Sequence, residues 1–297
     1  MNASRPGRLG VGIIGAGKVG VVLGAALRAA EHQVVGVHAV SEASKERAEM
    51  LLPGVPVLEI PEILRRAELV LLAVPDDVLA DLVQGLAAAG HWQVGQLVVH
   101  TAGRYGTKVL EPASKAGAIV LAIHPAMTFT GMSMDLERLN DCAFGVTAPN
   151  MVLPIAQALV VEMGGEPVVI AEEDRVIYHA ALAHASNHLV TIAGQAAGLL
   201  AGIGVERPDR VLSSLMRASL ENALASGENA LTGPVARGDV QTVVEHRAAL
   251  ESADVPSDTR EGYLAMSRAT ALRAKDRGLI GEQKLEAILA AIDGTGN

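Results

Sequence analysis

A glycine-rich turn near the amino terminus constrains the fold of this chain more than any other feature. It follows an apolar run and opens an apolar helical pattern, and it reads Gly15-Ala16-Gly17-Lys18-Val19-Gly20. In a dinucleotide-binding strand–turn–helix unit, the first glycine permits the tight turn and the second lets the backbone approach a pyrophosphate. The third lets helix and strand pack closely, and the free N–H groups of the helix face the phosphates. We therefore predict that these six residues contact a dinucleotide.

The same residues also match most of a triphosphate-binding loop that would begin at Gly12. Val19 then stands where that loop needs a hydroxyl group to ligate magnesium, which argues against a triphosphate. A glycine-rich turn that binds nothing is the other alternative. The order of strand, turn and helix favours dinucleotide binding over both.

The end of the second predicted strand bears on which dinucleotide binds. An NAD site usually has Asp or Glu there, about 20 residues beyond the glycines. In this chain the strand is followed by Ser41, and the acid Glu42 comes one residue later. Ser41 and Ser44 are candidate ligands for a 2′-phosphate, whereas Lys45 and Arg47 either join them or form a solvated helix face. We predict NADP, with NAD as the alternative.

The hydrophobic pattern predicts two domains. Up to residue 171, short runs rich in Val, Leu and Ile alternate with helical patterns, as in a doubly wound, mostly parallel sheet covered on both faces. Beyond residue 171 the patterns are helical. We therefore expect an α/β Rossmann domain over 1–171 and an all-α domain over 172–297. The predicted strands are Leu9–Ile14, Gln33–Ala39, Glu68–Val74, Gln96–His100, Ala118–Ile123, Cys142–Thr147 and Pro167–Ile170.

Polar or turn-forming residues follow several of these strands. Ligands of an open α/β sheet lie beyond the carboxyl ends of its strands. Val74, Pro75 and Thr101 follow two such ends and are predicted to line the cofactor cleft. His124 follows a third, and the ordinary pKa of histidine suits proton transfer near neutrality.

Composition narrows the classes of partner. The formal net charge of −9 argues against binding to nucleic acid or to an anionic membrane. The apolar runs are too short to span a bilayer, and the one cysteine, Cys142, lies in an apolar run and is expected to be buried and inert. The histidines have no metal-ligand spacing; the pair His184 and His188 lacks the catalytic Glu of a zinc helix. We expect a cytoplasmic protein without a metal.

Further motifs follow the glycine turn in a recognisable order. The set resembles a bacterial family of Rossmann-like proteins with a helical carboxyl-terminal domain of unknown function. That family is related to ketopantoate reductase, pyrroline-5-carboxylate reductase and the 6-phosphogluconate and hydroxyisobutyrate dehydrogenases. The resemblance implies hydride transfer at a small carboxylate substrate and a homodimer formed through the carboxyl-terminal helices. The motifs are Val74-Pro75-Asp76, His100-Thr101-Ala102-Gly103, His124-Pro125, Thr128-Phe129, Tyr178-His179-Ala180, Ser186-Asn187 and Leu231–Asp239.

One departure from these relatives affects the chemistry. The dehydrogenases carry a lysine four residues before an asparagine on the first long helix of the second domain. Asn187 matches that asparagine, but Ala183 stands in the lysine position. His179, Ser186 and Asn187 share one face of this helix. We predict that Asn187 and Ser186 orient the substrate, and that His124 or His179 assists proton transfer.

A glycine-rich break separates two helical patterns of the second domain and supplies the remaining substrate candidates. It contains Thr232, Gly233 and Arg237, and an arginine in such a loop can hold a carboxylate through two parallel hydrogen bonds. Alternatively, Arg237 pairs with Asp239 and the motif is a helix cap.

Taken together, these residues predict an NADP-dependent oxidoreductase that transfers a hydride between NADPH and a small 2-keto or imino acid, with ketopantoate as a candidate. Two alternatives stay open. One is a dinucleotide-binding regulatory or scaffold protein without catalysis, and the other is a deazaflavin:NADP oxidoreductase.

Overall fold

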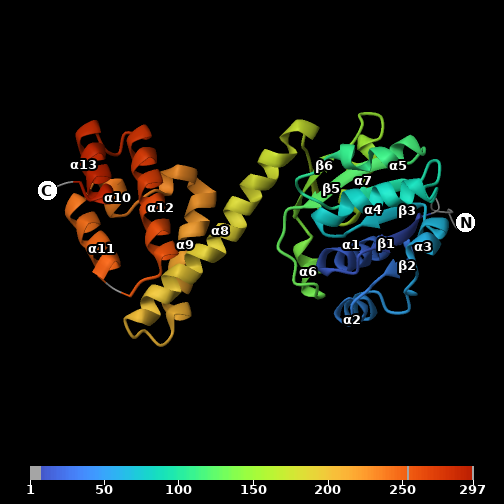
Figure 1. The fold of residues 1–297 in the computed structure, drawn as a ribbon, viewed down its shortest axis with the longest axis horizontal. Coiled ribbons are helices and arrows are strands. Elements are labelled where there is room, and N and C mark those ends of the chain that lie inside the picture. The colour runs from blue at the N-terminus through green and yellow to red at the C-terminus, as the bar shows by residue number, and fades with distance from the viewer. Residues whose placement is uncertain (1–7, 253, 296–297) are drawn as a thin grey trace, which may run out of the picture. The chain divides into compact units, whose positions relative to one another are not determined.

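The computed structural model describes residues 8–252 and 254–295. The chain forms two compact units, Met1–Ser186 and Asn187–Asn297, and helix α8 (Arg175–Gly202) runs from the first into the second (Figure 1). The domain boundary predicted after residue 171 falls just before this helix and stays a prediction.

The first unit is built on one sheet. Within the described residues its strand order is β2-β1-β3-β4-β5-β6-β7, and all neighbouring pairs are parallel except the antiparallel pair β5–β6. The predicted doubly wound, mostly parallel sheet is therefore confirmed. The strands are β1 (Gly10–Ile14), β2 (Gln33–His38), β3 (Leu69–Leu72), β4 (Leu97–His100), β5 (Ile119–Pro125), β6 (Ala143–Thr147) and β7 (Glu166–Val169).

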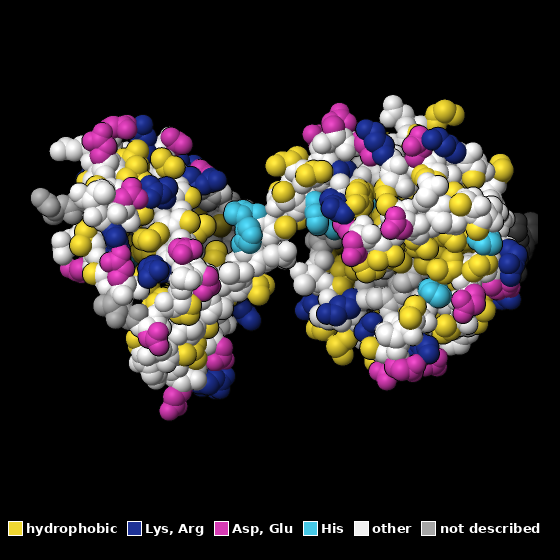
Figure 2. Space-filling model, viewed as in Figure 1, with side chains coloured by type: hydrophobic (Ala, Val, Ile, Leu, Met, Phe, Trp, Pro, Cys, Tyr) yellow, Lys and Arg dark blue, Asp and Glu magenta, His cyan; other side chains and the backbone are white. Residues whose placement is uncertain are grey.

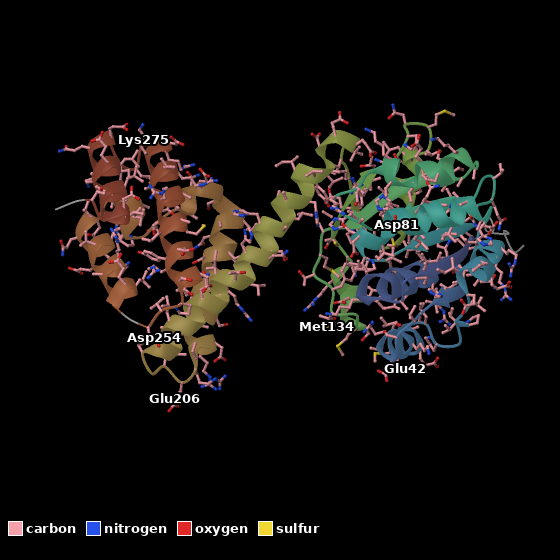
Figure 3. The ribbon with its side chains drawn as sticks, viewed as in Figure 1. Glu42, Asp81, Met134, Glu206, Asp254 and Lys275 are labelled. Atoms are coloured by element: carbon pink, nitrogen blue, oxygen red, sulfur yellow. The ribbon has the colours of Figure 1, made fainter. Side chains whose placement is uncertain are left out.

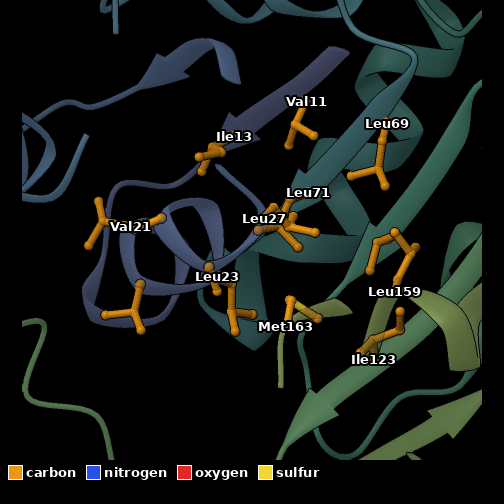
Figure 4. Close-up of a cluster of buried hydrophobic side chains, with 14 of the residues drawn as sticks. Val11, Ile13, Val21, Leu23, Leu27, Leu69, Leu71, Ile123, Leu159 and Met163 are labelled. Carbon is orange, nitrogen blue, oxygen red and sulfur yellow. The ribbon is translucent and has the colours of Figure 1, made fainter. Parts of the chain in front are cut away.

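Both faces of the sheet are covered, which explains why its central strands are continuously apolar. Ile13, Leu71 and Ile123 project from one face and pack with Leu23 of α1 and Leu159 of α7 (Figure 4). Their alternate neighbours on the same strands project from the other face and pack with α3, α4 and α5. The helical elements of this unit are α1 (Lys18–Ala29), α2 (Glu42–Leu51), α3 (Ile60–Arg66), α4 (Asp76–Ala88), η1 (Thr107–Leu110), α5 (Glu111–Lys115), α6 (Met134–Arg138), α7 (Leu153–Glu162) and η2 (Glu172–Asp174).

The second unit is mostly helical, as predicted, and has no strand among its described residues. Its core is made of small and branched side chains, among them Val243, Ala271 and Ile288. The predicted break at 226–238 contains two short helices. The second of them forms because Pro234 favours the first turn of a helix, and Gly238, in the left-handed conformation, ends that helix. After α8, the elements are α9 (Pro208–Ser226), η3 (Gly227–Ala230), α10 (Pro234–Arg237), α11 (Val240–Ser252), α12 (Ser257–Asp276) and α13 (Glu282–Asp293).

Candidate functional site

The glycine turn has the geometry expected of a dinucleotide loop. Gly15 has a φ of 103°, and a Cβ there would clash with the Ala73 carbonyl oxygen; a Cβ at Gly20 would clash with the Gly15 carbonyl oxygen. A Cβ at Gly17, by contrast, would meet nothing within 4 Å. Gly17 is also the N-cap of α1, where no described side chain caps the helix. The turn therefore leaves an open approach to the positive end of a helix, which suits a phosphate group.

Arg47 of α2 lies beside this turn. Its Nε donates to the Ala16 carbonyl oxygen at 3.4 Å. A Cβ on Gly131 would lie 3.0 Å from Lys18 Cγ and 3.1 Å from Arg47 Cδ, so the loop before α6 covers both cationic side chains. The buried carboxylate of Asp135 holds this loop by accepting hydrogen bonds from the Thr130 and Gly131 N–H groups. Two cations thus flank the predicted phosphate position.

The other polar residues at the start of α2 are engaged with one another. The Ser41 side chain caps the helix by accepting from the Ser44 N–H at 3.2 Å. The Ser44 hydroxyl donates to the Ser41 carbonyl oxygen at 2.6 Å and is buried, so it does not point outward. Glu42 projects from the helix into solvent and pairs with Lys45 at 2.8 Å (Figure 3). Ser41, the N-cap of α2, and Arg47 stay candidates for contact with a 2′-phosphate.

The end of β3 borders the glycine turn, and the end of β4 lies next to β3. The backbone of Val74 approaches Gly15, and Pro75 is the N-cap of α4. Thr101 donates its N–H to the Leu72 carbonyl oxygen at 3.2 Å. Both ring nitrogens of the buried His100, next to Thr101, hydrogen-bond within the loop that follows β4. Nδ1 accepts from the Ala102 N–H, and Nε2 lies 2.8 Å from the Gly106 carbonyl oxygen. His100 therefore shapes the segment that carries Thr101.

His124, Tyr178 and His179 form a cluster at the end of β5, which continues to Pro125 and so includes His124. The Tyr178 hydroxyl lies 3.0 Å from His124 Nδ1, and the two histidine rings meet edge to face with centroids 5.9 Å apart. Gly145 pairs with His124 across β5 and β6, and its missing side chain makes room for the Tyr178 ring. A Cβ on Gly103 would lie 3.0 Å from His124 Nε2. His179 Cδ2 would lie nearer still, at 2.5 Å, so glycine at position 103 lets both histidine rings pack against its backbone.

The cluster keeps His124 neutral. Burial, followed by the nearby charges of His179 and Arg175, lowers the pKa of His124 from 6.5 to about 4. Burial also raises the pKa of Tyr178, so the phenol retains its proton at neutral pH, and we assign it as the donor to His124 Nδ1. That hydrogen bond assigns the remaining imidazole proton to Nε2. His124 thus offers a neutral N–H donor beside Gly103.

Arg175, at the start of α8, lies beneath this cluster and is 1% exposed. Its Nε donates to the Thr147 hydroxyl at 2.7 Å, and one Nη donates to the carbonyl oxygens of Ala122 and Gly145. The other Nη has no hydrogen-bond partner among the described residues. The guanidinium group lies 5.7 Å from the centre of the Tyr178 ring. Arg175 thus fixes the first turn of α8, which carries Tyr178 and His179.

The remaining predicted residues are divided between the units. In the first, the Ser186 hydroxyl lies 3.4 Å from the Thr128 hydroxyl. In the second, Asn187 is exposed. Arg237 is exposed and makes no ion pair with a described residue, whereas Asp239 caps α11 by accepting from Thr242. The predicted helix cap at Asp239 is therefore present, but no salt bridge joins Arg237 to Asp239; the Arg237 charge only helps to lower the pKa of Asp239, after its hydrogen bonds with Thr242. Thr232 and Gly233 lie just before α10 in this second unit.

Sequence reasoning missed Tyr178, Arg175 and the position of Arg47. Tyr178 was noted only as part of a motif, and its contact with His124 joins residues far apart in the chain. A signal was present in Arg175, a lone cation that opens an apolar helix three residues before Tyr178. Such a cation is buried only where backbone or side-chain oxygens satisfy it.

Other predicted properties concern the whole chain. In the described ranges, no three His, Cys, Asp or Glu side chains gather as a metal site. Cys142 is buried, and burial raises the pKa of its thiol. Of the helices that the structure describes, none is both long and apolar enough to cross a membrane.

The sheet order, the glycine turn and the helical second unit define a Rossmann-like protein with an α-helical carboxyl-terminal region. A family model described as a Rossmann-like domain matches residues 1–125, and one described as a domain of unknown function, DUF2520, matches residues 142–270. The chain therefore belongs to the Rossmann-like proteins that carry a DUF2520 domain, as the predicted resemblance implied. No curated protein matches it.

Solved structures share this fold over most of their length. A protein from Bacteroides fragilis named as an NADP oxidoreductase is 22% identical, with a TM-score of 0.75, covering 89% of this chain and 98% of that one. A protein from Thermotoga maritima is 25% identical, with a TM-score of 0.63, covering 88% and 98%. A reductive aminase from Aspergillus terreus, in complex with NADPH and ethyl-5-oxohexanoate, is 16% identical, with a TM-score of 0.67, covering 94% and 98%.

Proposed function

We propose that this protein is an NADP-dependent reductase that transfers a hydride between NADPH and a small 2-keto or imino acid, ketopantoate being one candidate. The observation that carries the proposal is the carboxyl edge of the sheet, where the open glycine turn follows β1 and the His124–Tyr178–His179 cluster lies at the end of β5, a parallel strand separated from β1 by β3 and β4. The named activities of structural neighbours, among them a reductive aminase bound to NADPH and a pyrroline carboxylate reductase with NADP bound, are consistent with it.

The residues around the glycine turn fit a phosphorylated dinucleotide. Gly17 and the uncapped start of α1 would receive the pyrophosphate, with Val74 and Pro75 beside them. Arg47 and Ser41 would bind the 2′-phosphate that distinguishes NADP from NAD. Because Lys45 pairs with Glu42, the charges of these two residues compensate each other and neither adds a net charge at the 2′-phosphate position.

Bound NADPH supplies the hydride, so the protein must stabilise the charge that develops on the substrate oxygen or nitrogen. The neutral Nε2–H of His124 is placed to donate a hydrogen bond to that atom. Tyr178 holds the tautomer by donating to Nδ1, and Arg175 holds Tyr178 in place. His179, whose ring meets that of His124 edge to face, is the second candidate for proton transfer. Either histidine would take the role of the lysine that the related dehydrogenases carry where this chain has Ala183.

Further polar residues are proposed to bind the substrate. Ser186 and Asn187 orient its polar centre, and Arg237, without an ion pair among the described residues, binds its carboxylate through two hydrogen bonds. Thr232 and Gly233 supply the adjoining backbone. A carboxylate substrate is consistent with the positive charge of Arg237.

The protein acts as a homodimer that buries α8 and α9. In α9 no residue is buried, and in α8 only Arg175 is. Val190, Leu215 and Leu224 are 72%, 62% and 80% exposed. Figure 2 shows hydrophobic side chains, in yellow, among the charged ones on the surface of the helical unit. Two long helices with apolar exposed residues are typical of a surface that a second copy covers.

The proposal is tested by titrating NADPH and NADH against the protein and by following absorbance at 340 nm with ketopantoate and a panel of 2-keto and cyclic imino acids. We expect NADPH to bind at least about tenfold more tightly than NADH, since a phosphate–guanidinium pair contributes about 1.5–3 kcal/mol. We also expect turnover with at least one acid. Tight binding without turnover across the panel favours the regulatory alternative, and turnover that requires an added deazaflavin favours the deazaflavin oxidoreductase. Binding of neither nucleotide would contradict the proposal.

A further inference from the structure

Asp135, at the start of α6, is a buried carboxylate that takes no part in the proposed reaction. It is 0% exposed and accepts hydrogen bonds from the Thr130 N–H at 2.7 Å, the Gly131 N–H at 2.8 Å and the Thr130 hydroxyl at 3.0 Å. Burial raises the pKa of Asp135, but these hydrogen bonds outweigh it and hold the pKa below its usual value. A buried, ionised carboxylate is stable only where such donors satisfy it, so Asp135 and the residues before it fix one another.

The segment that Asp135 holds is the loop between β5 and α6, residues 126–133, and α6 lies beside α1 (Figure 1). Gly131 in this loop is buried and has a φ of 81°, in the left-handed region that favours glycine. A Cβ on Gly131 would lie 3.0 Å from Lys18 Cγ and 3.1 Å from Arg47 Cδ, closer than such atoms normally approach. Glycine therefore lets the loop backbone pack on the stems of two cationic side chains that belong to different helices.

This packing leaves the charges of both side chains for a ligand. Lys18 is exposed and Arg47 is half-buried, and neither makes an ion pair with a residue that the structure describes. The Asp135 carboxylate does not neutralise them, because it is bonded to the loop and lies 3.5 Å from Arg138. Long, flexible side chains lose conformational freedom when a phosphate orders them, and packing their stems beforehand reduces that loss.

We propose that Asp135 is a positioning residue for cofactor selection, which acts through the 126–133 loop to hold Lys18 and Arg47 ready for phosphate groups and so increases the preference for NADPH over NADH. The inference rests on the function proposed above. Lys18 belongs to the turn that receives the pyrophosphate, which both nucleotides carry, whereas Arg47 is proposed to bind the 2′-phosphate of NADPH alone. A disturbed loop therefore weakens NADPH binding more than NADH binding.

The test compares the Kd values of NADPH and NADH, measured by isothermal titration of the full-length protein. Gly131→Ala puts a methyl group against both stems, and we expect it to raise the Kd for NADPH about tenfold and the Kd for NADH no more than about threefold. Gly90→Ala is the matched control, because Gly90 also has a positive φ, 68°, but a Cβ there would meet nothing within 4 Å. It should leave the ratio of the two Kd values unchanged.

Two substitutions of Asp135 separate positioning from folding. In Asp135→Ala the loop loses its acceptor, so the preference for NADPH should fall as it does in Gly131→Ala. In Asp135→Asn the amide oxygen can still accept from the loop N–H groups, so most of the preference should return. A loss of stability alone lowers both affinities together and does not change their ratio. If Asp135→Ala does not fold, Gly131→Ala and Gly90→Ala decide the question.

The outcomes distinguish this inference from the function on which it rests. A wild type that binds NADPH no more tightly than NADH would overturn the proposed cofactor and the inference together. A wild type that prefers NADPH, with the preference intact in Gly131→Ala, would overturn the inference alone. An equal loss of preference in Gly90→Ala would also overturn it, because backbone strain and not the contact with the two cations would then be the cause.

Discussion

At the scale of single residues, His100 and His124 show how partners decide the role of a histidine. Both end neighbouring strands, and burial lowers the pKa of each to about 4. Both ring nitrogens of His100 hydrogen-bond to its own loop, whereas His124 hydrogen-bonds through Nδ1 only, to the Tyr178 hydroxyl. Histidine at a strand end was predictable from the sequence. Which of the two keeps a free nitrogen depends on Gly103 and Tyr178, which only the folded chain brings near.

The first residue-scale prediction concerns pH. Burial disfavours the imidazolium form, so the pKa of His124 moves down, and the neutral form persists until the pH falls toward 4. We expect the logarithm of kcat/KM to show no inflection from His124 near pH 6.5, and a loss of activity only as the pH approaches 4. The measurement is the pH profile of the wild type and of His124→Gln. An inflection near pH 6.5 that disappears in His124→Gln would show that the residue titrates normally.

The second residue-scale prediction concerns the Tyr178 hydroxyl. Tyr178→Phe leaves His124 Nδ1 without its donor, so the Nε2–H tautomer is no longer enforced. We expect kcat to fall about 10- to 100-fold, the usual effect of losing a partner that orients a catalytic histidine, while the Kd for NADPH stays unchanged. Tyr105→Phe is the matched control and should keep full activity. Equal activity in the two variants would remove Tyr178 from the mechanism.

At the scale of elements, the sheet follows from local pattern but its surroundings do not. Continuous runs such as Leu69–Leu72 predict strands covered on both faces, because only such strands are apolar at every position. Arg47, in contrast, is one of several charged residues on a polar helix. Its contact with Ala16 depends on how α2 packs beside the glycine turn, which periodicity does not encode. For the same reason Ser44 is a candidate ligand in the sequence, whereas in the structure its buried hydroxyl donates to the Ser41 carbonyl oxygen.

Arg47 and Lys45 provide the element-scale prediction, because they stand on one helix with different partners. Arg47→Ala should weaken NADPH binding about tenfold or more and leave NADH binding unchanged, since it removes the guanidinium group beside the phosphate position. Lys45→Ala, which removes only an exposed pair with Glu42, should change neither affinity by more than about threefold. Isothermal titration of both nucleotides measures this. A parallel loss of NADPH and NADH affinity in Arg47→Ala would place the residue at the pyrophosphate instead.

At the scale of the whole molecule, the exposed helices α8 and α9 predict self-association. Leu215→Glu puts a charge on the apolar surface of α9, and we expect it to turn a dimer into a monomer at micromolar concentration. Val94→Glu is the matched control, because Val94 is 86% exposed but lies in the first unit. Light scattering coupled to size-exclusion chromatography measures the mass. A wild type that elutes as a monomer, or a Leu215→Glu variant that remains dimeric, would contradict this interface.

The most direct measurement of the central claim is transfer of deuterium. The protein is mixed with NADPH that carries deuterium at C4, in each stereochemical form, and with ketopantoate and the 2-keto acid panel; the products are analysed by mass spectrometry. The account predicts one 2-hydroxy acid that carries deuterium on the former carbonyl carbon, from one of the two stereochemical forms only. NADPH that binds tightly but delivers no deuterium to any member of the panel, with no cyclic imine labelled either, would contradict the reductase and leave a dinucleotide-binding protein without this chemistry.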